Sequence, residues 1–388
     1  MPMRTTGKVT SVLSLILGFA LVGSLLPGGL QGQSTSNDPA AAWQNMVEKA
    51  VAFLRKSQNE NGSWSREPMS RGVTGIVVTG LIRTGYGPDD PTTAKGLKYI
   101  ESLVNTKSGH IAGDDAKATL INYVTSVNVM ALVAAKRDDK YRAIIGNAVK
   151  YLKSYQWDES RGVTPDHTYY GGAGYAGDKS RPDLSNTAFF LEALKEAGVD
   201  KNDPAFKKAL VFVSRCQNFK SEFNTAEWAA KYNDGSFIYT GANQGENRRS
   251  DDTKGDLAGY GSMTYAGIKS MIYCGVGKDD PRMKKALEWV AKNYTLDANP
   301  GMPAANSQRG LYYYYHTFAK CMDVLGEDTF TDAQGVKHDW RADLIAALAK
   351  RQRADGSWVN DNDRWMEGDP NLVTGYALMA LSYCKPKK

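Results

Sequence analysis

The chain has 388 residues, of which 42% are hydrophobic and 23% are charged, an ordinary composition for a globular protein with a large core. Residues 1–33 carry two basic residues and no acidic ones, so the remainder has a net charge of 46 minus 42, or +4. A charge this small and dispersed gives no indication of nucleic-acid binding.

The N-terminus has the pattern of a secretory signal. Arg4 and Lys8 precede an apolar run, Val9–Leu26, and small residues follow it. We expect residues 1–33 to be a signal peptide that is cleaved, and an uncleaved anchor is the alternative. Residues 34–42 are a predicted linker. The protein is therefore expected to be exported, to the periplasm or beyond, and to contact a membrane only through its N-terminus or a lipid substrate.

After the linker, the sequence predicts helices in pairs. The first helices start near residues 43, 91, 140, 204, 281 and 340, and the second near 72, 121, 184, 261, 312 and 372. Near each second start a Thr stands seven residues before an apolar residue, as in Thr187 and Leu194. Repetition at roughly 50–60 residues indicates stacked units that cannot bury their apolar faces alone. Six helical hairpins can close into a ring, so we predict an all-α, (α/α)6 double barrel over residues 43–385.

Two first helices end in the same turn, Gln58-x3-Gly62-Ser-Trp64 and Gln352-x3-Gly356-Ser-Trp358. Gly supplies the left-handed residue that stops a helix, and Gln and Trp can tie the turn to its neighbours. Long inserts at 105–120, 157–181 and 218–258 are expected to cover one mouth of the barrel. The four cysteines lie in predicted helices beside apolar residues and form no CxxC motif, which favours buried thiols.

These turns and helical pairs, with Asp183-Leu-Ser-Asn-Thr-Ala188, resemble the prenyltransferase and squalene-oxidase repeats of squalene–hopene cyclases. The resemblance to this terpenoid cyclase and protein prenyltransferase superfamily covers about residues 43–385. It implies a proton donor at the middle Asp of an Asp-x-Asp-Asp motif. Here Asp183 matches the first Asp, Ser185 the middle one and Asn186 the last. A serine hydroxyl is too weak an acid to protonate an alkene, so the usual cyclisation route is not expected.

The resemblance also raises the question of a zinc site. Prenyltransferase β subunits hold zinc with an Asp, a Cys and a His at two inner helix starts. Tyr315-His316-Thr317 resembles the His segment, but Ala258 and Tyr260 stand where Asp and Cys belong. One ligand of three makes no zinc site, so we predict no metal and no cofactor.

The aligned helix starts single out residues expected to converge at one mouth. We predict catalytic roles for His316, Asp183 and Asn186, because His titrates near neutral pH and the other two occupy the motif. Structural roles remain open for all three: a satisfied core His, an N-cap, and a hydrogen-bonding amide. The residues predicted to bind a hydrophobic ligand are Tyr260, Ser262, Tyr170, Tyr315 and Trp365, with helix packing as the alternative.

An acidic loop, 360–369, precedes the last inner helix. Its carboxylates belong to Asp361, Asp363, Glu367 and Asp369. A calcium loop, a carboxylate pair and a solvated capping loop are all compatible with it, although the spacing fits no EF-hand.

Three hypotheses follow. The first is an exported, cyclase-like toroid that binds or transforms an isoprenoid or other hydrophobic ligand. The second is a non-catalytic binding or scaffold protein on the same fold. The third is a carbohydrate-active enzyme, for which Asp183 paired with Asp256 or Asp369 offers the two carboxylates that glycosidases need.

Overall fold

The structure is a computed structural model that describes residues 38–114, 120–176, 180–249 and 257–386. Contacts separate Met1–Ser36 from a compact unit, Asn37–Lys388, and the description below concerns that unit alone. The predicted signal peptide, residues 34–37 of the predicted linker and Asp256 lie outside the described residues.

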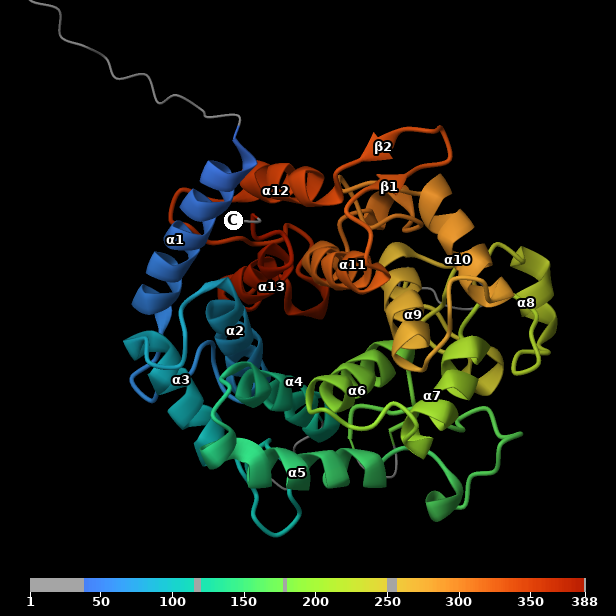
Figure 1. The fold of residues 1–388 in the computed structure, drawn as a ribbon, viewed down its shortest axis with the longest axis horizontal. Helices are drawn as coiled ribbons and strands as arrows, with labels where there is room; N and C mark the ends of the chain where they lie inside the picture. Colours follow the sequence, from blue (N-terminus) through green and yellow to red (C-terminus); the bar gives the residue numbers. More distant parts are fainter. Residues whose placement is uncertain (1–37, 115–119, 177–179, 250–256, 387–388) are drawn as a thin grey trace, which may run out of the picture. The chain divides into compact units, whose positions relative to one another are not determined.

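Six helices form an inner ring (Figure 1). Each packs against the next, and α13 packs against α2 to close the ring. These inner helices are α2 (Ser70–Thr84), α4 (Ile121–Ala134), α6 (Leu184–Glu196), α9 (Gly261–Tyr273), α11 (Leu311–Leu325) and α13 (Pro370–Ser382).

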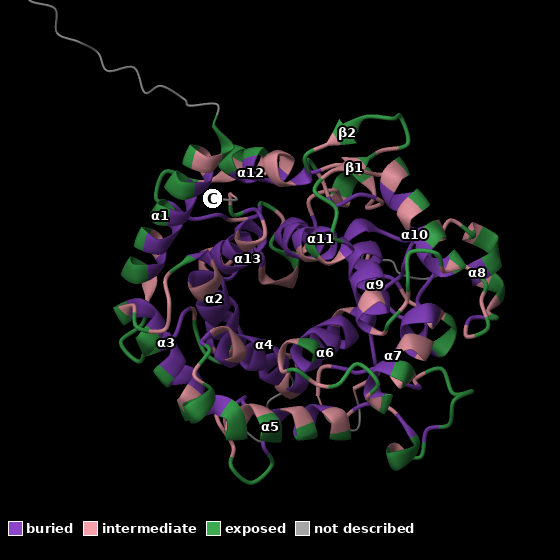
Figure 2. Ribbon diagram, in the orientation of Figure 1, coloured by how far each residue is buried: buried purple, intermediate pink, exposed green. Residues whose placement is uncertain are grey.

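Six further helices surround the ring, as the paired pattern predicts. They are α1 (Pro39–Ser57), α3 (Pro91–Ser102), α5 (Asp138–Ser154), α7 (Pro204–Arg215), α10 (Pro281–Lys292) and α12 (Trp340–Arg351). The inner helices are buried almost all round, whereas the outer helices are buried on one face and exposed on the other (Figure 2). This all-α toroid of two concentric rings of helices confirms the predicted fold class.

Local sequence explains where the outer helices start. Asp90, Asp203 and Asp280 cap α3, α7 and α10, and each precedes a Pro at the first helical position. An Asp side chain accepts hydrogen bonds from the first free N–H groups, and Pro has no N–H that would need a partner there.

The repeated turn ties neighbouring units together. Gln352 Nε2 donates to the carbonyl of Gly356, at 3.0 Å, and to that of Met46 in α1, at 2.9 Å. The N–H of Trp358 donates to the hydroxyl of Thr374, one of the aligned threonines, at 3.2 Å. Equivalent bonds to the turns are made by Thr74, Thr125, Thr187 and Thr264. The recurring Thr is therefore an anchor for the turn between the two helices of a pair.

Smaller elements depart from the predicted pattern. The insert 218–258 contains a short helix, α8 (Glu227–Tyr232), and a two-stranded antiparallel hairpin, β1 (Phe330–Thr331) and β2 (Lys337–His338), precedes α12. Four 3-10 helices span Glu159–Arg161, Ala242–Gln244, Ala304–Asn306 and Arg364–Met366.

All four cysteines are free thiols. Cys216, Cys321 and Cys384 are buried, as predicted, and Cys274 is partly buried. Among the described residues, no helix is both long enough and apolar enough to cross a membrane.

Candidate functional site

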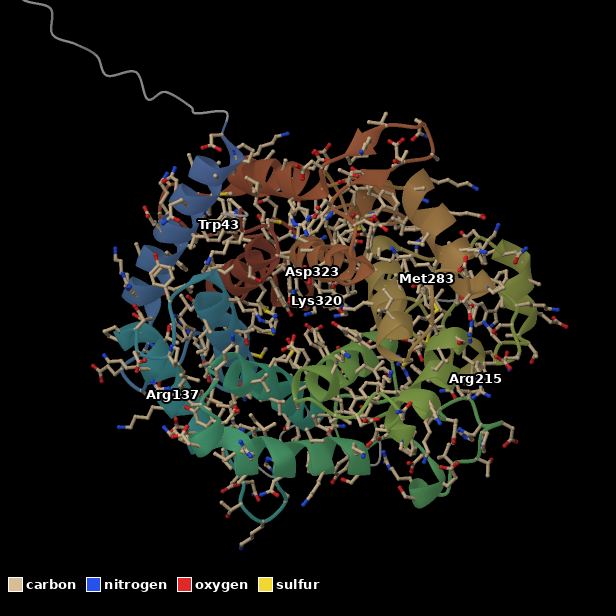
Figure 3. The ribbon with its side chains drawn as sticks, in the orientation of Figure 1. Trp43, Arg137, Arg215, Met283, Lys320 and Asp323 are labelled. Carbon is tan, nitrogen blue, oxygen red and sulfur yellow. The ribbon has the colours of Figure 1, made fainter. Side chains whose placement is uncertain are left out.

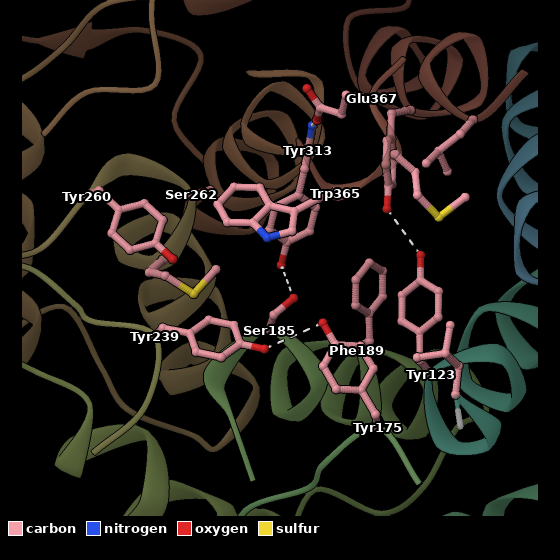
Figure 4. A pocket seen from close by; sticks show the side chains of 15 residues that line it. Tyr123, Tyr175, Ser185, Phe189, Tyr239, Tyr260, Ser262, Tyr313, Trp365 and Glu367 are labelled. Atoms are coloured by element: carbon pink, nitrogen blue, oxygen red, sulfur yellow. Dashed lines mark hydrogen bonds between the residues drawn. The ribbon is translucent and has the colours of Figure 1, made fainter. Parts of the chain in front are cut away.

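A largely apolar cavity of about 260 Å³ lies at the end of the barrel where the inner helices begin (Figure 4). Five inner helices contribute to its wall, among them α4 with Tyr123, α6 with Ser185 and Phe189, α11 with Tyr313 and α13 with Tyr376. Side chains in the first two turns of a helix point back toward its N-terminus, which is why the starts of different helices meet at one level.

Hydrogen bonds between hydroxyl groups fix the wall of the cavity. Ser185 Oγ and Tyr313 Oη are 3.0 Å apart, and the hydroxyls of Tyr123 and Tyr376 are 3.1 Å apart. Burial raises the pKa of Tyr123 to about 12, and it also raises the pKa of Tyr313. These tyrosines are therefore uncharged at neutral pH, and they offer aromatic faces with a few paired hydroxyls.

Three of the five predicted ligand-binding residues line this cavity: Tyr260, Ser262 and Trp365. The other two are not among its lining residues. Tyr170 donates its hydroxyl to Glu159, at 2.8 Å, and Tyr315 donates to the carbonyl of Leu296, at 2.6 Å. Both tyrosines lie in other parts of the packing, since the Tyr-rich pattern does not indicate which way each ring turns.

Asp183 is 1% exposed and caps α6, which matches the structural alternative for this residue. Its Oδ1 accepts the N–H of Asn186, at 2.9 Å, and its Oδ2 accepts Asn186 Nδ2, at 2.7 Å. Burial raises the pKa of Asp183 to about 6, against the lowering effect of hydrogen bonds from Asn186 and Tyr239. Asp183 and Asn186 thus form a capping pair behind the wall, and their catalytic roles stay predictions.

His316 lies beneath the wall, one turn after Tyr313. It is completely buried, and its ring stacks against those of Phe189 and Tyr376. Burial lowers the pKa of His316 to about 3, so the ring is neutral at physiological pH. The unperturbed value near 6.5 does not apply to this ring, because charging a ring that water does not reach is costly. The catalytic role of His316 stays a prediction.

A layer of charges fills the barrel below His316. Lys269 forms an ion pair with Glu192, and Glu196 binds Arg83 at 2.5 Å and Lys320 at 3.3 Å. Lys320 lies near the centre of the ring (Figure 3). Burial raises the pKa of Glu192, but the charges of Lys269 and Lys320 outweigh it and hold that pKa well below its ordinary value. We name these five side chains the charge layer.

Glu367 belongs to the acidic loop for which the sequence left a calcium loop, a carboxylate pair and a solvated capping loop open. It lines the cavity and is 1% exposed. Its carboxylate accepts the N–H groups of Tyr312 and Tyr313, at 3.2 and 2.8 Å, and Asn360 Nδ2, at 2.6 Å. Burial raises its pKa to about 7, although these hydrogen bonds lower it. It caps α11 from a loop that lies 54 residues beyond Tyr313 in the chain, so only the tertiary structure reveals the pairing.

The rest of the acidic loop has structural roles. Asp369 caps α13 by accepting the N–H groups of Asn371 and Leu372. Trp365 and Met366 both have left-handed backbone angles, with φ of 58° and 67°, and these hold the two side chains at the cavity. Within the part of the chain that the structure describes, no cluster of three His, Cys, Asp or Glu side chains could hold a metal ion.

Comparison with known proteins gives one curated relative and a set of similar structures. No family model matches the chain. A squalene–hopene cyclase of Bradyrhizobium diazoefficiens is 29% identical over 133 residues, which are 30% of this chain. The match covers only 20% of that relative's length.

The structural matches cover nearly the whole chain. The type II terpene cyclase MstE from Scytonema, in complex with geranylgeranyl dihydroxybenzoate, aligns with a TM-score of 0.55 and 14% identity, over 90% of this chain and 99% of that one. A glycosidase aligns with a TM-score of 0.53 and 14% identity, over 91% and 99%. The chain therefore has a terpenoid cyclase-like fold, a fold that a glycosidase shares.

Proposed function

We propose that the protein binds an isoprenoid or another elongated hydrophobic ligand in the aromatic cavity at the start of the inner helices. The observation that carries the proposal is the wall itself: aromatic rings and paired hydroxyls at the level where the resemblance to cyclases implies a proton donor. Burying apolar ligand surface against such a wall contributes about 25 cal/mol of binding free energy per Å². Few polar groups of the wall have to lose their water when the ligand binds. The structure of an Arg-to-Ala variant of the cyclase MstE, which has a similar fold, holds geranylgeranyl dihydroxybenzoate as substrate, and this supports the ligand class.

In this proposal the cavity binds its ligand and does not cyclise it by the usual route. Ser185 stands where the resemblance places the proton donor, and its hydroxyl is paired with that of Tyr313 at 3.0 Å. Neither hydroxyl is acidic enough to protonate an alkene, since burial raises the pKa of Tyr313 further. Incubation with squalene should return unchanged squalene by gas chromatography with mass spectrometry, and a cyclised product would contradict this assignment.

Trp365 provides the test of binding. Its indole lines the mouth of the cavity, so Trp365→Ala should weaken the binding of farnesol by about tenfold in calorimetric titration. Trp157→Ala is the matched control, because Trp157 lies in the 157–181 insert and is not among the lining residues. Native mass spectrometry of the purified protein should also detect a co-purified lipid. Absence of both farnesol binding and bound lipid would refute the proposal.

A glycosidase is a second candidate, favoured by Glu367. A glycosidase needs one carboxylic acid that stays protonated near neutral pH and a second carboxyl group nearby. Glu367 lines the cavity with a pKa of about 7, Asp183 lies behind the wall with a pKa of about 6, and a glycosidase shares the fold. Hydrolysis of aryl glycosides that Glu367→Gln abolishes would establish this candidate in place of the first.

Export remains a prediction from residues 1–33. N-terminal sequencing of the protein secreted by its host would show whether the segment is removed.

A further inference from the structure

We propose that a layer of aromatic rings closes the bottom of the cavity and sets the length of ligand that it accepts, with Phe189 as the depth-determining residue. The inference rests on the proposed binding function. We call the part of the wall that lies over His316 the aromatic floor, and define it as Tyr123, Phe189, Tyr313 and Tyr376, all of which line the cavity.

The rings of the floor contact one another and rest on His316. Phe189 and Tyr376 both stack against the His316 ring, with centroid distances of 6.3 and 5.9 Å and interplanar angles of 15° and 19°. Tyr123 meets Phe189 edge-on at 5.1 Å, and Tyr313 lies 6.0 Å from both Phe189 and Tyr376. These contacts span α4, α6, α11 and α13, so the floor crosses the inner barrel from one side to the other.

Hydrogen bonds fix three of the four floor residues. Tyr123 and Tyr376 bind each other through their hydroxyls, and Tyr313 binds Ser185. Phe189 has no hydroxyl and is held by packing alone. Its side chain can therefore be shortened or enlarged without leaving a hydrogen-bonding group unpaired. The size of the side chain at this position should therefore set the depth of the cavity.

The charge layer prevents a hydrocarbon chain from reaching deeper. On α6, Glu192 follows Phe189 by three residues, so the same face of the helix turns from aromatic to charged within one turn. Lys269, which is 3% exposed, pairs with Glu192, and Lys320 follows His316 by four residues on α11. An apolar chain that entered this layer would have to displace buried ion pairs, at a cost of several kcal/mol.

The aromatic floor therefore separates the apolar cavity from the charge layer. A ligand that enters from the mouth beside Trp365 has to end at the floor. Shortening Phe189 should open space toward the neutral His316 ring, and enlarging it should raise the floor.

The test uses three prenyl alcohols, geraniol, farnesol and geranylgeraniol, each one isoprene unit longer than the last. Calorimetric affinities are compared for the full-length wild type and for Phe189→Ala, Phe189→Leu and Phe189→Trp. We expect the tightest-binding alcohol to become longer by one unit in Phe189→Ala, with a gain of about tenfold for that alcohol over wild type. Phe189→Trp should shift the preference to the shorter alcohol.

Met263→Ala is the control. Met263 lines the wall from the first turn of α9, so its removal enlarges the cavity without lowering the floor and should leave the preferred length unchanged. Circular dichroism confirms folding, and Phe189→Leu replaces Phe189→Ala if the latter fails to fold.

The outcomes separate this inference from the function on which it rests. If the wild type binds these alcohols but the folded Phe189 variants keep its length preference, the depth-determining role of Phe189 is refuted and the binding function stands. If the wild type binds none of them, the binding function fails and the inference fails with it.

Discussion

Asp183 and Asn186 are joined by two hydrogen bonds, one from the backbone N–H of Asn186 to Oδ1 at 2.9 Å and one from its side-chain amide to Oδ2 at 2.7 Å. Both carboxylate oxygens are thus engaged by the first turn of the helix that Asp183 caps. Oδ1 of the Asn186 amide has no hydrogen-bond partner. The pair holds the start of α6 in place beneath the tyrosine wall, and its energy depends on pH.

Asp183→Asn should remove a pH-dependent part of the stability. Folding raises the pKa of Asp183 from about 3.9 in an unfolded chain to about 6. The stabilising contribution of the protonated carboxyl is therefore complete below about pH 4 and is lost as the pH rises through about 6. Between these limits the wild type should lose up to about 3 kcal/mol relative to the variant.

Urea unfolding at several pH values between 4 and 7.5 measures this difference. The new amide can still cap α6 and can donate to the free Oδ1 of Asn186, so the variant should fold. Asp200→Asn, at an exposed carboxyl, is the matched control. A wild-type curve parallel to that of Asp183→Asn would show that the carboxyl does not titrate in this range.

Gly356→Ala should destabilise the repeated turn strongly. Gly356 has a φ of 90°, and a Cβ there would lie 2.2 Å from the carbonyl oxygen of Lys49 in α1. Left-handed strain and steric overlap together should cost about 3 kcal/mol or more. The matched control is Gly335→Ala in the β1–β2 turn, where φ is 83° and no atom lies within 4 Å, so only strain of about 1–2 kcal/mol applies. Equal losses in urea unfolding would mean that α1 moves to accommodate the methyl group.

Lys269→Met should be more harmful than removing the whole ion pair. The single change leaves the buried carboxylate of Glu192, which is 0% exposed, without its partner and should cost about 3–5 kcal/mol. The double variant Lys269→Met with Glu192→Leu should recover most of that loss, since no uncompensated charge remains. A double variant as unstable as the single one would show that Glu192 is stabilised mainly by the other cations of the charge layer. Thermal unfolding of the three proteins decides between these results.

Local sequence determines much of this fold. Pro91, Pro204 and Pro281 start their helices where Asp precedes Pro, because capping and a fixed φ act within a few residues. The aligned threonines reveal the repeat, since five of the six bond to the turn of their own hairpin. The convergence of Ser185, Tyr260 and Ser262 at one mouth also follows from the repeat, because equivalent positions of equivalent helices share a level.

The tertiary structure decides what those positions can do. His316 has the ordinary chemistry of histidine in the sequence, yet packing against Phe189 and Tyr376 removes water and keeps it neutral. In the sequence, Glu367 is one of several acidic residues in a polar loop. It lines the cavity only because this loop folds back over the start of α11. Burial, stacking and long-range capping depend on segments far apart in the chain. The sequence by itself therefore determines the helices and their repeat, whereas the ionisation and accessibility of the site are decided by what packs around each side chain.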